Sequence, residues 1–161
     1  MGINGLGKTT LLSILYRALL GPKDQSKSDE VGLLGSQHEL SAWRNKAFFR
    51  DRVKDGAKDA TAEIDVQFGE KLLTVRRRLN NLDVEYLAVD GNELEASQEA
   101  YEAKVVEISG TSTYFDFFAI LRYLVFFLED RVELIWDRRS QFDMFRILLY
   151  DTAAAKAASE A

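Results

Sequence analysis

The feature that most constrains this chain is a phosphate-binding loop close to its amino-terminal end. Residues 2–9 read Gly-Ile-Asn-Gly-Leu-Gly-Lys-Thr, which meets the spacing G-x-x-x-x-G-K-[ST] in full. An apolar-rich run of helical length, residues 10–20, follows directly, so the loop is predicted to open a helix. The glycines let successive backbone N–H groups curl around an anion, and the start of the helix faces the same anion. The sequence therefore predicts a site for the phosphates of a nucleotide.

Individual residues of the loop have expected roles in such a site. Lys8, one of two candidate catalytic residues (the other is Glu129), is expected to reach the β- and γ-phosphates and to stabilise developing charge together with Gly5 and Gly7. The Thr9 hydroxyl is expected to hold Mg²⁺. The predicted nucleotide-binding residues are Asn4, Gly5, Leu6, Gly7, Lys8, Thr9 and Thr10.

Only Met1 precedes this loop. A phosphate-binding loop follows a buried strand that sets its position. We therefore expect the chain to be a fragment whose first core strand lies upstream. Residues 1–152 are expected to form one lobe. The alanine-rich residues 153–161 are expected either to begin a coiled-coil helix or to form a disordered tail.

Composition excludes several classes of protein. The 161 residues include no cysteine and one histidine, so a disulfide framework, a histidine-based metal site and a Ser-His-Asp triad are not expected. The most apolar stretch, residues 114–128, is short and contains Asp116 and Arg122, so no membrane span or membrane partner is expected. No signal peptide is visible, and a cytoplasmic location is expected. The net charge of −5 argues against non-specific nucleic-acid binding by the whole surface.

Periodicity predicts the order of the elements. The first helix is expected to end near Leu20, because Gly21-Pro22 follows, and residues 23–35 are expected to form a mobile loop. Alternation of apolar and polar residues predicts an antiparallel meander of strands at residues 62–68, 72–79 and 84–89. Helical patterns occupy residues 40–53, 97–109, 114–122 and 140–150. The apolar run 124–128 is expected to be a strand covered on both faces.

The form of the loop resembles one branch of the ABC-type ATPases. G-x-N-G-x-G-K-T-T-L-L, with Asn4 in the middle and Thr9-Thr10 before two leucines, is similar to the loops of SMC (structural-maintenance-of-chromosomes) and double-strand-break-repair proteins. Heads of that family are split. An N-terminal lobe carries the loop, a coiled coil intervenes, and a C-terminal lobe supplies the signature motif and the Walker B acids. This chain has no L-S-G-G-Q-like segment and resembles the first half alone.

The resemblance implies an α/β fold: a P-loop NTPase core, the N-terminal lobe of an ABC/SMC head, with an attached antiparallel β-sheet. It implies ATP and Mg²⁺ as cofactors, and hydrolysis by attack of water on the γ-phosphate. The implied partners are the C-terminal lobe of the same head, a second head in a homodimer, DNA, and accessory or effector subunits. Hydrolysis would drive engagement and release of paired heads, acting on DNA in repair or anti-phage defence.

A second segment resembles SMC-like ATPase subunits of bacterial anti-phage defence systems of the Lamassu type. It comprises residues 120–131, followed by residues 134–137 and Gln141. In this family a glutamine at the end of a nearby strand contacts Mg²⁺ and the attacking water. Glu129 occupies the expected position of that glutamine, so a carboxylate replaces a neutral amide. Gln141, further along and on an expected helix, is a second candidate for the Mg²⁺ contact.

Two other interpretations of the catalytic residues remain open. The apolar run that ends in Glu129-Asp130 resembles a Walker B strand, whose acid holds Mg²⁺ through water. The chain would then be a compact stand-alone P-loop NTPase, although the two acids stand in the reverse of the usual order, and a purely structural strand end fits as well. Alternatively, the chain is a binding module in which nucleotide only orders an interface.

Three consecutive arginines, residues 76–78, lie on an expected strand and would suit contacts with DNA phosphates. Alternation places Arg77 on the opposite face from Arg76 and Arg78, so the three cannot form one patch. A solvated sheet face is therefore the preferred interpretation. Its expected cross-strand partners are Glu63, Asp65 and Glu85.

Overall fold

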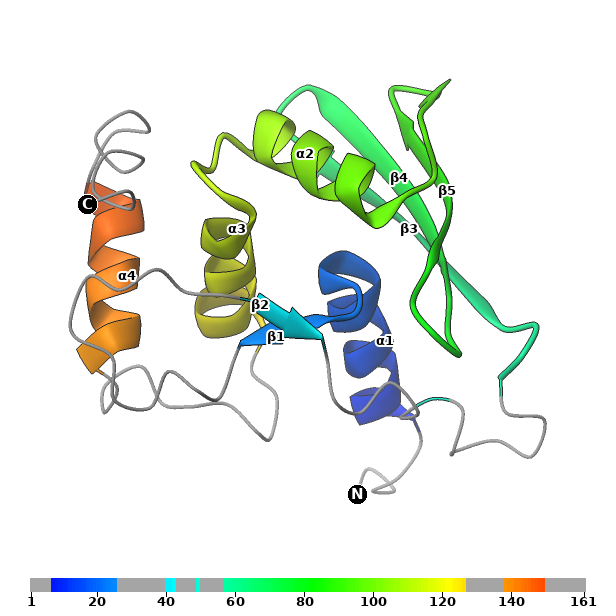
Figure 1. Ribbon diagram of the computed structural model, residues 1–161, viewed down its shortest axis with the longest axis horizontal. Helices are drawn as coiled ribbons and strands as arrows, with labels where there is room; N and C mark the ends of the chain where they lie inside the picture. Colours follow the sequence, from blue (N-terminus) through cyan, green and yellow to red (C-terminus); the bar gives the residue numbers. More distant parts are fainter. Residues whose placement is uncertain (1–6, 26–39, 43–48, 50–56, 127–137, 150–161) are drawn as a thin grey trace.

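The computed structural model describes residues 7–25, 40–42, 49, 57–126 and 138–149. This part of the chain is a mixed α/β structure with a four-stranded antiparallel sheet and four α-helices (Figure 1). The helices are α1 (Lys8–Leu20), α2 (Gln98–Ser109), α3 (Tyr114–Ile120) and α4 (Arg138–Leu149). The main sheet contains, in spatial order, β3 (Thr61–Phe68), β4 (Lys71–Arg78), β5 (Val84–Val89) and β6 (Asn92–Glu93). A separate antiparallel pair consists of β1 (Lys23–Gln25) and β2 (Leu40–Ala42).

The meander predicted from alternation is confirmed. β3 and β4 pair along their whole length, from Thr61 opposite Arg78 to Phe68 opposite Lys71. The turn between β5 and β6 has two residues with positive φ, Asp90 and Gly91. Such a pair is typical of a two-residue hairpin turn, because its twist matches that of the flanking strands.

The core lies between one face of the main sheet and the helices α1, α2 and α3. Leu73 and Val75 of β4 and Leu87 of β5 are fully buried there. The helices contribute aromatic and aliphatic side chains to the same cluster, among them Tyr16, Leu19, Leu20, Tyr101, Val105, Tyr114, Phe117 and Phe118. The last turn of α1 lies beside α2 and the main sheet, whereas its first turn points away from both (Figure 1).

Capping residues define the starts of two helices. The Ser97 hydroxyl accepts a hydrogen bond from the Ala100 N–H at the start of α2, and Thr113 accepts one from the Asp116 N–H at the start of α3. These are the side-chain caps that satisfy otherwise unpaired N–H groups of a first turn. The predicted helix from Ser97, ended by Gly110, is therefore confirmed.

Three sequence predictions differ from the structure. Residues 23–25 form β1 rather than part of a loop, and residues 40–42 form β2 rather than the start of a helix. The two short strands pair with each other, a long-range contact that local periodicity does not encode. Phe49, which lies in a turn, is the one other described residue of these two predictions, and the rest lie outside the described ranges.

The third difference concerns the apolar run at residues 124–128. Leu124 and Val125 end a π-helix, η3 (Leu121–Val125), that continues directly from α3. Of the run 124–128 the structure describes residues 124–126, and among these three only Phe126 has an extended backbone. Its N–H donates to the Leu121 carbonyl at 2.8 Å. A short, unbroken apolar run suits a buried helix as well as a buried strand, which is why the sequence alone misassigned it.

Helix α4 lies on the outer side of α3 (Figure 1) and confirms the helix predicted near residues 140–150. Its Met144 joins Ala119 and Tyr123 in a second small core cluster. The Arg146 guanidinium forms an ion pair with Asp116 of α3, and both side chains are almost completely buried. Hydrophobic contact and a buried ion pair thus attach α4 to the rest of the structure.

Candidate functional site

Helix α1 begins at Lys8, directly after Gly7. Gly7 has a φ of 74°, in the left-handed region that favours glycine, and its carbonyl accepts a hydrogen bond from the Leu11 N–H at 2.8 Å. Unlike α2 and α3, this helix start has no side-chain cap, and its first turn contains no acidic residue. Within this first turn, no carboxylate compensates the positive end of the helix dipole, an arrangement that favours an external anion.

The structure describes part of the predicted site. The side chains of Lys8 and Thr9 are exposed at the start of α1, and Thr10 is half-buried. The other predicted contacts, Asn4, Gly5 and Leu6, lie outside the described residues, as do Glu129 and Asp130. Gln141 is a half-buried residue of α4, and in Figure 1 α3 lies between α4 and α1.

The opposite end of α1 is held by an extensive set of hydrogen bonds. The last four carbonyls of a helix have no partner within the helix. In α1 each of these four carbonyls accepts a hydrogen bond from a group outside the helix. The Gly21 N–H donates to the carbonyl of Arg17 at 2.7 Å. Side chains from the sheet, α2 and α3 donate to the other three carbonyls. Arg77 Nε donates to the carbonyl of Ala18, the Tyr101 hydroxyl to that of Leu19, and the Tyr114 hydroxyl to that of Leu20.

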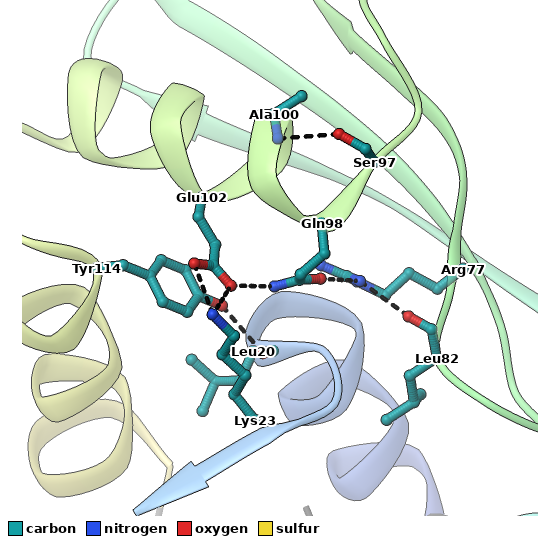
Figure 2. Close-up of polar contacts among 9 residues, drawn as sticks. All are labelled: Leu20, Lys23, Arg77, Leu82, Ser97, Gln98, Ala100, Glu102 and Tyr114. Atoms are coloured by element: carbon teal, nitrogen blue, oxygen red, sulfur yellow. Dashed lines mark hydrogen bonds and ion pairs between the residues drawn. The ribbon is translucent and has the colours of Figure 1, made fainter. Parts of the chain in front are cut away.

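Arg77 is the centre of this junction. Its side chain is fully buried, and its Nη1 donates to the Leu82 carbonyl at 2.9 Å and to Gln98 Oε1 at 2.7 Å. Its guanidinium carbon lies 4.5 Å from the centre of the Tyr101 ring, within the range of a cation–π contact. Figure 2 shows Arg77 reaching from β4 toward Leu82 and Gln98. One side chain therefore joins β4, α1 and α2.

The network continues from Gln98 to β1. Gln98 Nε2 donates to Glu102 at 2.8 Å, and Glu102 in turn forms an ion pair with Lys23 at 2.6 Å (Figure 2). Gly21 passes close to the same groups. A Cβ atom at Gly21 would lie 2.8 Å from Gln98 Oε1 and 3.0 Å from Arg77 Nη1, so it would displace these side-chain ends, and the φ of 63° itself favours glycine.

Burial perturbs the two tyrosines of this junction. Removal from water raises the pKa of Tyr101 to about 12, because the phenolate would be buried without solvation. Burial also raises the pKa of Tyr114 well above its usual value. Both hydroxyls therefore remain protonated donors to the end of α1 at neutral pH.

A second group of charges fixes the same half of α1. Asp24, which follows the helix, accepts hydrogen bonds from Arg17 at 3.3 Å and from Arg122 of η3 at 3.2 Å. Arg122 also donates to the Tyr16 hydroxyl at 3.4 Å. Burial is the main cause of the lowered pKa of Arg17, and it also raises the pKa of Tyr16.

The arginine row on β4 partly follows its prediction. Arg76 pairs with Glu63 at 3.3 Å and Arg78 pairs with Glu85, which confirms a solvated, ion-paired face. Asp65 was wrongly expected to join these pairs, because it accepts instead from the Thr74 hydroxyl at 2.6 Å. The structural role of Arg77 was not predicted from the sequence. The sequence contains a signal for this role, because alternation along β4 places Arg77 on the same face of the strand as two apolar residues.

Comparisons with known proteins yield no match: no family model, no curated protein and no solved structure matches this chain. Among the described residues, no helix has both the length and the apolar character needed to cross a membrane. The same residues contain no cluster of three or more His, Cys, Asp or Glu side chains that could hold a metal ion.

Proposed function

We propose that this chain is the ATP-binding lobe of an SMC-like ATPase, that is, the N-terminal lobe of an ABC/SMC-type head. One observation carries the proposal: a helix without a side-chain cap begins at Lys8, directly after Gly7, the left-handed second glycine of a complete G-x-x-x-x-G-K-T motif. The motif requires this succession of loop and helix, because the backbone N–H groups and the helix dipole must face the same phosphates.

Each residue of the motif has a chemical task in this proposal. Lys8 would neutralise the β- and γ-phosphates, and the Thr9 hydroxyl would hold Mg²⁺. The backbone N–H groups of the glycine-rich loop stabilise the charge that develops as water attacks the γ-phosphate. The protein's contribution is positioning and electrostatic stabilisation, since phosphoryl transfer requires little covalent chemistry from side chains.

The proposal includes a second lobe that covers the start of α1. The side chains of Leu11 and Leu12 are 58% and 45% exposed. Burial of exposed leucines is favourable, so a helix that is apolar on more than one side is expected to be covered in the complete protein. We assign this cover to the C-terminal lobe of the same head. A second head, DNA and accessory subunits complete the proposed assembly, which would act in the cytoplasm.

The alternative, a stand-alone NTPase that uses Glu129 or Asp130, places these acids at the end of a core strand. Residues 121–125 form a π-helix, and Glu129 and Asp130 lie outside the described residues. Phosphate release by the isolated chain separates this alternative from the proposal. The paired state of Arg76 and Arg78 means that this sheet face offers DNA few uncompensated charges. Any DNA contact in the proposal is therefore assigned to another surface.

Calorimetric titration of the chain with Mg-ATP tests the proposal. We expect binding by the unchanged chain and, for Lys8→Ala, at least roughly tenfold weaker binding, since a hydrogen bond to a charged group contributes about 1.5–3 kcal/mol. Lys58→Ala, which removes an exposed lysine far along the chain from the loop, is the matched control. Equal affinities for Lys8→Ala and Lys58→Ala would refute the site.

Phosphate release measured on the same samples separates the rival classes. The proposed lobe should bind ATP but release phosphate at close to the background rate until the second lobe and second head are supplied. Rapid release by the isolated chain would favour a stand-alone NTPase. Binding without release in the completed assembly would favour a module that uses nucleotide only to order an interface.

A further inference from the structure

We propose that Arg77 is a positioning residue for the phosphate-binding loop and acts on it through helix α1. The inference rests on the proposed function and adds a residue outside the motif to it. Arg77 contacts none of the loop residues that the structure describes. Its contacts lie at the far end of α1, where it joins the Ala18 carbonyl to β4 and α2.

The burial of α1 changes along its length. Lys8, Thr9, Leu11 and Leu12 are exposed, residues 13–15 are half-buried, and residues 16–21 are buried. Within the described part of the chain, the helix is therefore held by its last turns, and its first turns project from the core. The direction of the whole helix is set where it is held, at the junction with Arg77.

The length of α1 makes this attachment sensitive. A helix of 13 residues is about 20 Å long, so a tilt of about 10° at the held end would move the start of the helix by about 3 Å. A displacement of about 1 Å in a reacting group is enough to lower a rate by about a hundredfold. A fixed helix direction is therefore necessary for a loop that must contact phosphates at hydrogen-bond distance.

Arginine is suited to this task in a way that lysine is not. The guanidinium presents its donors in a rigid plane, and here Nε and Nη1 bind three acceptors on three different segments, the Ala18 carbonyl, the Leu82 carbonyl and Gln98 Oε1. A lysine ammonium is a single point on a flexible stem and cannot reach all three acceptors in the same geometry. Arg77→Lys thus retains the charge and loses the fixed direction.

Titration of Arg77→Lys with Mg-ATP tests the proposal. We expect its dissociation constant to rise at least about tenfold with unchanged binding stoichiometry, because in every molecule a displaced loop loses hydrogen-bond contact with the charged phosphates. The matched control is Arg78→Lys, on the exposed face of the same strand, which should stay within about twofold of the unchanged chain. A lower stoichiometry with an unchanged dissociation constant would indicate loss of folded protein and would overturn the proposal, as would unchanged values of both.

A distance measurement tests the same proposal without nucleotide. The chain contains no cysteine, so Leu12→Cys and Glu93→Cys provide two unique sites for spin labels, one on exposed α1 and one on β6. We expect the distance distribution in the Arg77→Lys background to shift or broaden by about 3 Å relative to the Arg78→Lys background. Identical distributions would overturn the positioning role. If the unchanged chain binds no ATP, the proposed function fails, and this measurement still decides whether Arg77 sets the direction of α1.

A second variant covers the case in which Arg77→Lys does not fold. The double substitution Tyr101→Phe and Tyr114→Phe removes two other donors to the end of α1 and preserves the ring volume. The same shift of the distance distribution is expected if the direction of α1 depends on this junction. An unchanged distance distribution in a folded double variant would overturn the proposal that this junction sets the direction of α1.

Discussion

At the scale of single residues, the junction at the end of α1 shows how polar groups are tolerated inside a small core. Arg77 is buried at a position that alternation assigns to the apolar face of β4. Backbone and side-chain oxygens accept from its Nε and Nη1, the Tyr101 ring covers its face, and its Nη2 is buried without a hydrogen-bond partner among the described residues. A guanidinium near the end of a helix is also favoured by the negative partial charge of the last carbonyls.

Tyr101 gives this junction a measurable pH dependence. Its pKa is raised by burial from 10.0 to about 12, so the folded state resists ionisation that the unfolded state undergoes. Stability from this group is complete below pH 10 and is lost as the pH rises toward 12, by about 2–3 kcal/mol over that range. Urea unfolding between pH 9 and 12 should show a smaller decline for Tyr101→Phe than for the unchanged chain. An equal decline of the free energy of unfolding in Tyr101→Phe and in the unchanged chain would contradict the raised pKa of Tyr101.

At the scale of elements, local signals were sufficient where a residue's role is local. Ser97, Gly110 and the alternation of β3 predict their elements because capping and pleating depend on neighbours in the sequence. Leu40 and Lys23 belong to strands only because two distant segments pair, and η3 continues α3 through a run that fits either structure. Tertiary contacts determine these elements, and periodicity cannot reveal them.

The turn after α1 is a prediction at this scale. Gly21 combines positive φ with an extended ψ of −151°, a region open to glycine almost alone, and a Cβ there would displace the side-chain ends of Gln98 and Arg77. We expect Gly21→Ala to lower the free energy of unfolding by about 2–3 kcal/mol. Gly110→Ala is the control, since Gly110 also has positive φ but has open space around it, and should cost about 1 kcal/mol. Equal losses in urea unfolding would show that the crowding at Gly21 has no effect.

The attachment of α4 is a second prediction for an element. Asp116 and Arg146 form a buried pair, so removal of either partner leaves an uncompensated charge inside the protein. Asp116→Ala is expected to destabilise the fold by about 3–5 kcal/mol, whereas a double replacement, Asp116→Leu with Arg146→Met, should recover most of this loss. The exposed pair Glu63–Arg76 is the comparison, and its loss should cost less than about 1 kcal/mol. A double variant as unstable as Asp116→Ala would contradict this account of the pair.

At the scale of the whole molecule, the candidate site and its support lie at opposite ends of one helix. The motif predicted where α1 begins and which side chains, Lys8 and Thr9, stand at its start. The sequence did not predict that a buried arginine and two tyrosines hold the other end, because this depends on the packing of β4, α2 and α3 around it. A local sequence motif and a set of tertiary contacts therefore occupy the two ends of the same helix.

The central claim, that the start of α1 binds the phosphates of ATP, is tested most directly by residue-resolved amide hydrogen exchange with and without Mg-ATP. The account predicts slower exchange for the amides of residues 5–10 in the unchanged chain when Mg-ATP is present, and no such protection in Lys8→Ala. The amides of β3 and β4 provide the internal reference. Protection that is absent from residues 5–10, or that persists in full in Lys8→Ala, would contradict the claim.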